Sequence, residues 1–257
     1  MTAFVDTHCH FDFEPFCNNE AESLRLAAEA GVEKIIAVGV AADRFAGVLS
    51  LAEKYEPLYA ALGTHPMAIA QHQEAHLQQL AVCLQQRSPK LVAIGEIGLD
   101  LYIEDPQFDK QQAVLDAQLR LARDFDLPVI LHSRRTHDKL AMLLRKRDLP
   151  ARGVVHGFAG SEQQAQAFIR EGFAIGVGGT ITYERASKTR NAIARLPLTS
   201  LLLETDSPDM PVQGFQGQPN RPERIKNVWQ SLCEIRDESP QEIAETIREN
   251  TRRLFGI

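Results

Sequence analysis

Leu91-Val-Ala-Ile-Gly95 and Pro128-Val-Ile-Leu-His132 are two short apolar runs, and the chain between them contains a longer segment with helical periodicity, Gln107–Phe125. Val114 and Leu121 fall on one stripe of that segment, as in a helix that buries one face. The two runs are continuously apolar, which is typical of strands covered on both faces of a parallel sheet. This stretch therefore predicts a strand, a helix and a second, parallel strand.

The same alternation extends over the whole chain. Apart from the two runs above, the expected strands are Phe4–Thr7, Lys34–Val40, Leu58–Gly63, Gly153–His156, Ala174–Val177 and Ser200–Glu204. Helix starts are marked by Ser161-Glu-Gln-Gln164, which has the pattern of a capping box, and by Ser239-Pro240. Eight strands that alternate with helices predict an α/β fold, a (β/α)8 TIM barrel formed by residues 1–257 as a single domain. An open, doubly wound sheet is the alternative.

Composition limits the class of protein. The 257 residues are 44% hydrophobic and 24% charged, and 28 Lys and Arg against 34 Asp and Glu give a net charge of −6. These values exclude a disordered chain and argue against a protein that coats nucleic acid through bulk positive charge. The sequence has no apolar run long enough to cross a membrane, no secretory signal and no CxxC pair among its 4 cysteines. We expect a cytoplasmic protein without a membrane partner, and a monomer by default.

Histidines and carboxylates lie at the ends of five expected strands. They are His8 and His10 after the first strand, Glu96 after the fourth, His132 and His156 at the ends of the fifth and sixth, and Asp206 after the last. In a TIM barrel the carboxyl ends of the strands meet at the active-site face. Imidazole and carboxylate ligands together suit divalent metal ions, and six are more than one catalytic zinc uses. We therefore expect two divalent ions (zinc, manganese or magnesium), with Glu96 placed to bridge them.

Six sequence blocks carry a resemblance to a known family. In chain order they are DTHCHFD, GTHP, GEIGLD, LHSRR, VHGF and ETDSP, and they resemble the signature blocks of TatD-type metal-dependent deoxyribonucleases, which are amidohydrolase-like barrels. The resemblance covers nearly the whole chain and implies the same six metal ligands. It also implies a hydrolase of phosphodiester bonds that acts as a 3′–5′ exonuclease on single-stranded DNA. Residues 209–223 depart from the basic, glycine-containing run typical of the family, which leaves substrate preference open.

Roles follow for several residues. We expect Asp206 to accept a proton from the metal-activated water. Glu96 is expected to assist catalysis as the ligand that bridges the two ions. Asp6 and Glu204 precede ligands by two positions, so their carboxylates are expected to accept hydrogen bonds from ligand rings; a structural salt link across the barrel floor is the alternative. The resemblance places His65 near the substrate phosphate, as a general acid or a phosphate donor; capping of the turn at Pro66 is the alternative.

Substrate contacts are less determined. Arg134 and Arg221 belong to loops expected on the active-site face and are candidates for binding DNA phosphates. One alternative function is hydrolysis of a carboxylic ester, lactone or aminoacyl-tRNA ester by the same metals. No lysine ends the fourth or fifth strand to serve as the carbamylated bridge of many amidohydrolases, which favours the nuclease. A third possibility is an inactive, metal-bound module for DNA repair.

Overall fold

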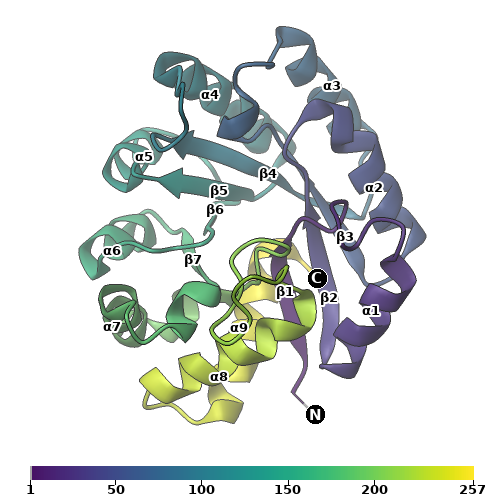
Figure 1. The fold of residues 1–257 in the computed structure, drawn as a ribbon. Helices are drawn as coiled ribbons and strands as arrows, with labels where there is room; N and C mark the ends of the chain where they lie inside the picture. The colour runs from purple at the N-terminus through teal and green to yellow at the C-terminus, as the bar shows by residue number, and fades with distance from the viewer. Residues whose placement is uncertain (1) are drawn as a thin grey trace.

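The structure is a computed structural model that describes residues 2–257, and it shows eight parallel strands surrounded by helices (Figure 1). The strands pair in chain order, as in a TIM barrel, so the predicted (β/α)8 fold is confirmed. The strands are β1 (Phe4–Cys9), β2 (Val32–Val38), β3 (Leu58–Leu62), β4 (Leu91–Asp100), β5 (Val129–Arg134), β6 (Gly153–Val155), β7 (Ala174–Val177) and β8 (Leu201–Leu203).

Helices follow the strands and cover the outside of the barrel (Figure 1). They are α1 (Glu20–Glu29), α2 (Phe45–Lys54), α3 (Glu74–Gln85), α4 (Phe108–Phe125), α5 (His137–Leu144), α6 (Glu162–Arg170), α7 (Ser187–Arg195), α8 (Ile225–Ile235) and α9 (Pro240–Phe255). The expected helix starts are present. Ser161 and Gln164 form a capping box at α6, and the Ser239 side chain accepts a hydrogen bond from the backbone N–H of Glu242 at α9.

The main difference from the expected strands is in β4, which continues to Asp100 instead of ending at Gly95. Glycine allows this extension, because a Cβ atom on Gly98 would lie 2.0 Å from the carbonyl oxygen of His132 on β5. A Cβ on Gly95 would likewise lie 2.6 Å from the Cβ of Ile130. The close approach of β4 to β5 carries both strands further toward the active-site end of the barrel.

The barrel closes where the ends of β1 and β8 meet. The backbone N–H of Asp206 donates to the carbonyl of His8 at 2.9 Å, and the N–H of His10 donates to the carbonyl of Ser207 at 2.7 Å. Cys9 and Ser207 form a parallel bridge between these two bonds. The first and last candidate ligand segments are therefore joined by main-chain hydrogen bonds.

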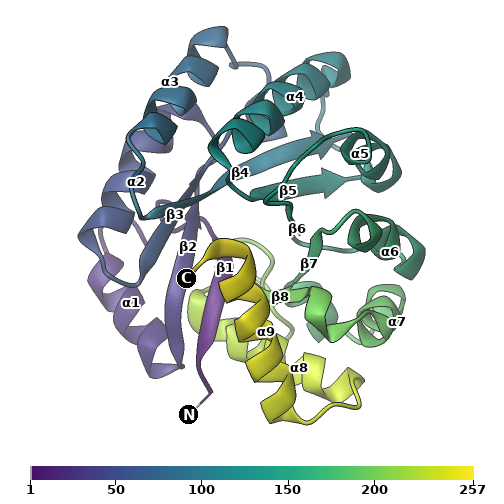
Figure 2. The same cartoon turned by 180° about the vertical axis from the view of Figure 1, so that it is seen from behind.

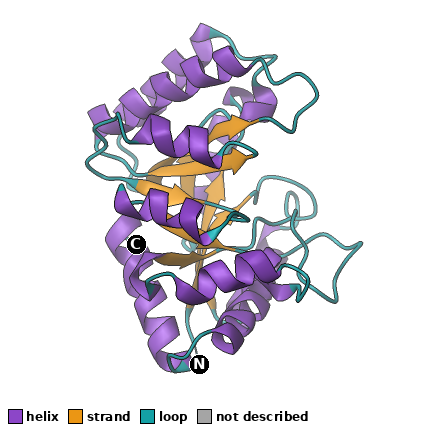
Figure 3. Cartoon of the chain, turned by 90° about the vertical axis from the view of Figure 1, so that its left-hand side faces the viewer, coloured by secondary structure: helices purple, strands orange, loops and turns teal. Residues whose placement is uncertain are grey.

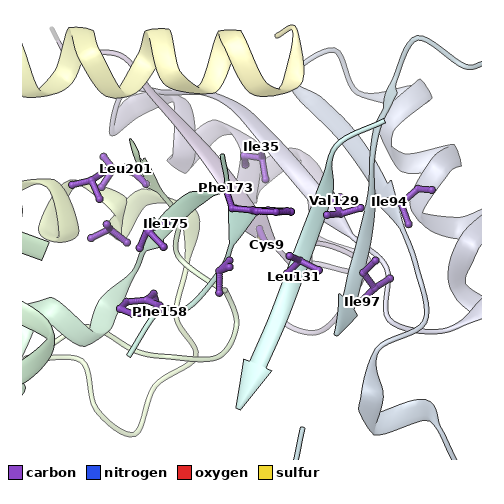
Figure 4. Packing of buried hydrophobic residues seen from close by; sticks show 14 of the residues in the cluster. Cys9, Ile35, Ile94, Ile97, Val129, Leu131, Phe158, Phe173, Ile175 and Leu201 are labelled. Carbon is purple, nitrogen blue, oxygen red and sulfur yellow. The ribbon is translucent and has the colours of Figure 1, made fainter. Parts of the chain in front are cut away.

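Two apolar clusters hold the barrel together. The larger lies between strands and helices, and Figure 4 shows its members Ile94, Val129, Ile175 and Leu201, which come from four different strands. The smaller cluster contains strand residues of the opposite parity, among them Ile130 and Val154. Its helix residue is Phe255, at the end of α9.

The two ends of the barrel differ. In Figure 2, α9 crosses one end and brings the C-terminus to its middle, while in Figure 3 long loops project from the other end. Ile130 and Val154 lie two residues before His132 and His156, so an apolar layer supports the imidazoles from below. Among residues 2–257, no helix combines the length and apolar character needed to cross a membrane.

Candidate metal centre

Glu96 is the centre of the polar cluster at the open end of the barrel. It is 2% exposed, and its two carboxylate oxygens face different groups of side chains. Oε2 lies 3.2 Å from Nε2 of His8 and 3.5 Å from Nε2 of His10. Oε1 lies 2.9 Å from Nδ1 of His132 and 2.6 Å from Nε2 of His156. One carboxylate therefore joins two sets of imidazole nitrogens.

Asp206 completes the first set. Its Oδ1 lies 3.3 Å from Nε2 of His8 and 3.4 Å from Nε2 of His10, and these two nitrogens are 3.3 Å apart. The φ angle of Asp206 is +56°, in the left-handed region that aspartate tolerates better than most residues. Together with its backbone bond to His8, this conformation places the carboxylate beside the two histidines.

The spacing of the first set fits a metal ion. Ligand atoms about 2.1 Å from a tetrahedral ion lie about 3.4 Å apart, because the edge of a tetrahedron is about 1.63 times its centre-to-corner distance. The separations that His8 and His10 make with each other, with Glu96 and with Asp206 run from 3.2 to 3.5 Å. His8, His10 and Asp206 thus place three donor atoms at the spacing of a coordination shell, and Oε2 of Glu96 lies at the same spacing from both imidazoles.

Three groups of side chains are close enough to hold a cation. They are His8 with Glu96 and His156, His8 with His10 and Asp206, and His65 with Glu96 and His132. Glu96 belongs to two of these groups and His8 to two. The six expected ligands are therefore brought together, with His65 beside them.

Electrostatics show how tightly these groups interact. Burial would lower the pKa of His10, but its hydrogen bond to Asp206 and the charge of Glu96 raise it to about 9. Burial would raise the pKa of Glu96, and the neighbouring imidazoles, His156 first, hold it well below the usual range. The carboxylates are therefore ionised beside histidines that can carry protons. Divalent cations compete with such protons for the same nitrogen atoms.

Asp100 is a member of the centre that the sequence analysis left without a role. Its Oδ2 lies 2.8 Å from Nε2 of His132, on the opposite side of the ring from Glu96. Burial would raise the pKa of Asp100, but the hydrogen bond to His132 lowers it. A carboxylate that accepts the outer N–H of a metal-binding imidazole fixes the tautomer and the orientation of the ring. Asp100 lies four residues after Glu96 on the same strand, and this spacing was the feature of the sequence that could have placed it at the centre.

His65 caps the turn at Pro66, which was the alternative considered for it, and it also turns its other ring nitrogen toward Glu96. Its Nδ1 accepts a hydrogen bond from the backbone N–H of Met67 at 2.9 Å and so caps the turn that begins at Pro66. With Nδ1 acting as acceptor, the proton of the neutral ring lies on Nε2, which is 3.1 Å from Oε1 of Glu96. Burial lowers the pKa of His65 and so favours this neutral form. The ring points an N–H group into the centre.

Asp6 and Glu204 take different positions. Asp6 does not contact a ligand ring, contrary to our expectation: Oδ1 accepts from the backbone N–H groups of His8 and Thr205, and Oδ2 from the hydroxyl of Thr205. It therefore ties β1 to the end of β8, and burial raises its pKa to about 7. Glu204 lies near His156, with 3.8 Å between Oε1 and Nδ1, and its Oε1 also accepts from the N–H of Gly157.

The two candidate substrate arginines also differ. Arg221 is turned into the protein: its Nε donates to Glu223 at 2.6 Å, its Nη2 to Ser23, and 18% of its side chain is exposed. The carboxylate two positions later pairs with its guanidinium, and most of the side chain is buried. Arg134 is exposed at the end of β5.

Three buried amides fix the surrounding loops, and the sequence analysis missed all of them. On α4, the Gln118 amide accepts from the backbone N–H of Thr64 at 2.7 Å, and Gln111 accepts from that of Asp100 at 2.8 Å. Asn220 donates to the carbonyls of Thr205 and Met210, which pins the loop that follows β8. For the two glutamines, their position on the buried face of α4 was the visible signal.

Comparison with known proteins agrees with this geometry. The sequence model of the family described as TatD related DNase matches residues 5–256. An Escherichia coli (strain K12) protein named uncharacterized metal-dependent hydrolase YjjV is 61% identical over 254 residues, with 99% of this chain and 98% of that protein covered. The 3'-5' ssDNA/RNA exonuclease TatD of Rahnella sp. (strain Y9602) is 30% identical over 253 residues, with 94% of each covered.

Solved structures give the same result for the fold. The crystal structure of the E. coli YjjV protein, a TatD homolog, superposes with a TM-score of 0.98 at 61% identity and covers 99% of this chain and 98% of that one. A TatD-family hydrolase from Entamoeba histolytica has a TM-score of 0.86 at 22% identity, with 99% of this chain and 98% of that one covered, and shares the fold.

Proposed function

The chain belongs to the TatD-related DNase family of metal-dependent hydrolases, and from this premise we propose that it removes nucleotides from the 3′ end of single-stranded DNA. We assign the metal ligands to His8, His10, Glu96, His132, His156 and Asp206, which would hold two divalent ions. The proposal rests on the position of the Glu96 carboxylate. One of its oxygens faces His8 and His10, and the other faces His132 and His156.

A pair of ions held by these residues would suit phosphodiester hydrolysis. When bound, such ions lower the pKa of a water molecule and offset the charge that develops on the phosphate oxygens. Each ion would have imidazole ligands, which favours zinc or manganese over magnesium. The buried apolar layer beneath the ligands excludes water from below, so substrate must approach from the open end of the barrel.

The chain's own groups have separate tasks in this proposal. Asp206 accepts the proton of the attacking water through its carboxylate, which is 17% exposed and lies at the open side of the cluster. His65 donates its Nε2 proton in a hydrogen bond to the phosphate or to the leaving oxygen. Asp100 holds His132 in the tautomer that presents Nδ1 to the centre. Glu96 orients both halves of the site.

The direct test is degradation of an end-labelled single-stranded oligodeoxynucleotide. Wild type and Asp206→Asn are compared after chelation and re-addition of single metals. We expect stepwise loss of nucleotides from the 3′ end by metal-loaded wild type, slowed at least about a hundredfold by the substitution. If the metal-loaded wild type leaves the oligonucleotide intact and hydrolyses a carboxylic ester or lactone, the nuclease assignment is wrong.

A further inference from the structure

We propose that Tyr102, Arg134 and Arg135 form a platform that stacks an unpaired base and binds the adjoining phosphate of a single-stranded nucleic acid. The proposal rests on the function proposed above and specifies its substrate class. It concerns a surface beside the metal centre, made by the loop after β4 and the end of β5.

Tyr102 is an exposed aromatic residue with two cations close to its ring. Its side chain is 52% exposed, and the guanidinium carbons of Arg134 and Arg135 lie 3.7 and 4.5 Å from the centre of its ring. Guanidinium groups stacked on a ring keep their N–H edges directed outward, where they can bind phosphate oxygens. Tyrosine rings and guanidinium planes are also the surfaces on which proteins stack unpaired bases.

The backbone is shaped to bring both arginines to this ring. Successive residues of an extended strand point to opposite sides, so Arg134 and Arg135 would normally diverge. Arg135 has a φ angle of +59°, in the left-handed region that arginine rarely adopts. This turn at the end of β5 allows neighbouring side chains to share one ring. Unfavourable backbone conformations of this kind concentrate at functional sites.

The platform is attached directly to the metal centre. The Asp100 carboxylate that holds Nε2 of His132 through Oδ2 also accepts the backbone N–H of Tyr102 through Oδ1, at 2.7 Å. The N–H of Leu101 donates to the carbonyl of Arg134 at 3.0 Å. Arg134 follows His132 by two residues, about 6.6 Å along an extended chain. That distance places the platform next to the reacting phosphate, within reach of the neighbouring nucleotide.

The two arginines are available for a ligand. Three other guanidinium groups at this end of the barrel are engaged: Arg221 pairs with Glu223, Arg44 with Asp12, and Arg224 donates to the carbonyl of Pro219. Within residues 2–257, Arg134 and Arg135 have the Tyr102 ring as their contact and no acidic side chain within ion-pair distance. Both side chains are exposed, so their N–H groups are open to a phosphate.

This chemistry selects an unpaired strand. A small phosphate ester has no base for the ring, and a base inside a duplex has no free face to offer. Stacking of bases on aromatic rings tolerates any sequence, so the platform would bind single strands with little sequence preference.

Binding can be measured separately from cleavage. Fluorescence anisotropy with a labelled single-stranded oligodeoxynucleotide is recorded on metal-loaded protein that carries Asp206→Asn, to which Tyr102→Ala, Tyr102→Phe or Arg134→Ala is added. We expect Tyr102→Ala to weaken binding about ten- to hundredfold, and Tyr102→Phe, which keeps the ring, to restore it. Arg134→Ala should reduce the slope of log K against log salt by about 0.7, the value for one phosphate contact on a single strand. Arg170→Ala, an exposed arginine at the far end of α6, is the matched control.

A strand of equal length that lacks bases tests the stacking itself. Tyr102→Ala should weaken its binding much less than that of the base-containing strand, because the ring then has no base to hold and only its support of the two arginines is lost. Equal binding of the base-containing strand by Tyr102→Ala and its parent would overturn the platform, and so would an equal loss with and without bases. If binding depends on Tyr102 but metal-loaded wild type cleaves no oligonucleotide, the platform stands and the proposed nuclease function is wrong. If wild type cleaves the oligonucleotide but Tyr102→Ala binds it as tightly as its parent does, the platform is wrong and the proposed nuclease function stands.

Discussion

Oδ2 of Asp100 lies 2.8 Å from Nε2 of His132, while Nδ1 of the same ring lies 2.9 Å from Oε1 of Glu96. The imidazole is therefore held between one carboxylate at the cluster and one behind it. Both carboxylates belong to β4, which reaches this position because Gly98 lets it approach β5 closely. The course of β4 thus positions both the candidate bridging ligand, Glu96, and the carboxylate of Asp100 that orients the His132 ring on β5.

Asp100→Asn should weaken metal binding without unfolding the protein. The amide would present N–H groups to Nε2 of His132, which favours the tautomer with its proton on Nδ1, the atom needed for the metal. Loss of such a partner costs about ten- to a hundredfold in metal affinity. Titration of metal-free protein against a competing chelator measures the change. Asp237→Asn, at an exposed position, is the control, and equal affinities of the two variants would exclude this role.

Glu96→Gln should reduce the number of metal ions that the centre binds. An amide offers one oxygen and one N–H₂ group, so it can serve at most one of the two sets of imidazoles. The metal content after dialysis should fall from two ions per chain to one or none, because the shared ligand is lost. Atomic absorption on Glu96→Gln and on Glu104→Gln, which changes an exposed carboxylate, gives the comparison. Full metal content in Glu96→Gln would show that the ions do not share this residue.

Asp206→Asn should separate metal binding from turnover. The carboxylate of Asp206 faces His8 and His10 through Oδ1, and an asparagine oxygen can keep that contact. It cannot accept a proton from water, so turnover should fall at least about a hundredfold. Rates are compared at saturating metal, with circular dichroism to verify the fold. Turnover like that of wild type in the folded, metal-loaded variant would remove Asp206 from this role.

Gln118→Leu should disturb catalysis from a distance. The buried amide holds the backbone N–H and carbonyl of Thr64, next to His65, and their loss leaves buried groups unpaired at a cost of about 1–3 kcal/mol. The free energy of unfolding should fall by that amount, and kcat should fall more than metal content does. Gln112→Leu on the same helix, at a half-buried position, controls for the change in side chain. An unchanged free energy of unfolding would show that the Gln118 amide does not stabilise the backbone at Thr64.

The six candidate ligands were visible in the sequence because each lies at or directly after an apolar run. Strand periodicity and the geometry of TIM barrels then suffice to bring those positions to one end. The lengths of the strands were less visible: β4 extends past two glycines that read locally as a turn, and only its packing against β5 explains why the strand continues.

The supporting residues could not be predicted, because their partners are distant in sequence. Gln118 and Thr64 are 54 positions apart, and nothing in either segment indicates the other. Asp6 was expected behind a histidine ring, but the close approach of β1 to the end of β8 offers it the backbone and hydroxyl of Thr205 instead. Arg221 was expected to face DNA, and its guanidinium donates to Ser23, 198 positions away, as well as to the nearby Glu223. In each case tertiary contacts decided between orientations that local sequence allows.

The central claim is that Glu96 joins two divalent ions, and anomalous diffraction from crystals grown with manganese tests it most directly. Two anomalous peaks should appear on either side of the Glu96 carboxylate, one beside His8, His10 and Asp206 and the other beside His132 and His156. Their separation should be about 3.5–4 Å, as in other two-metal sites. The absence of a peak at this carboxylate, or a single peak that does not touch it, would contradict the account.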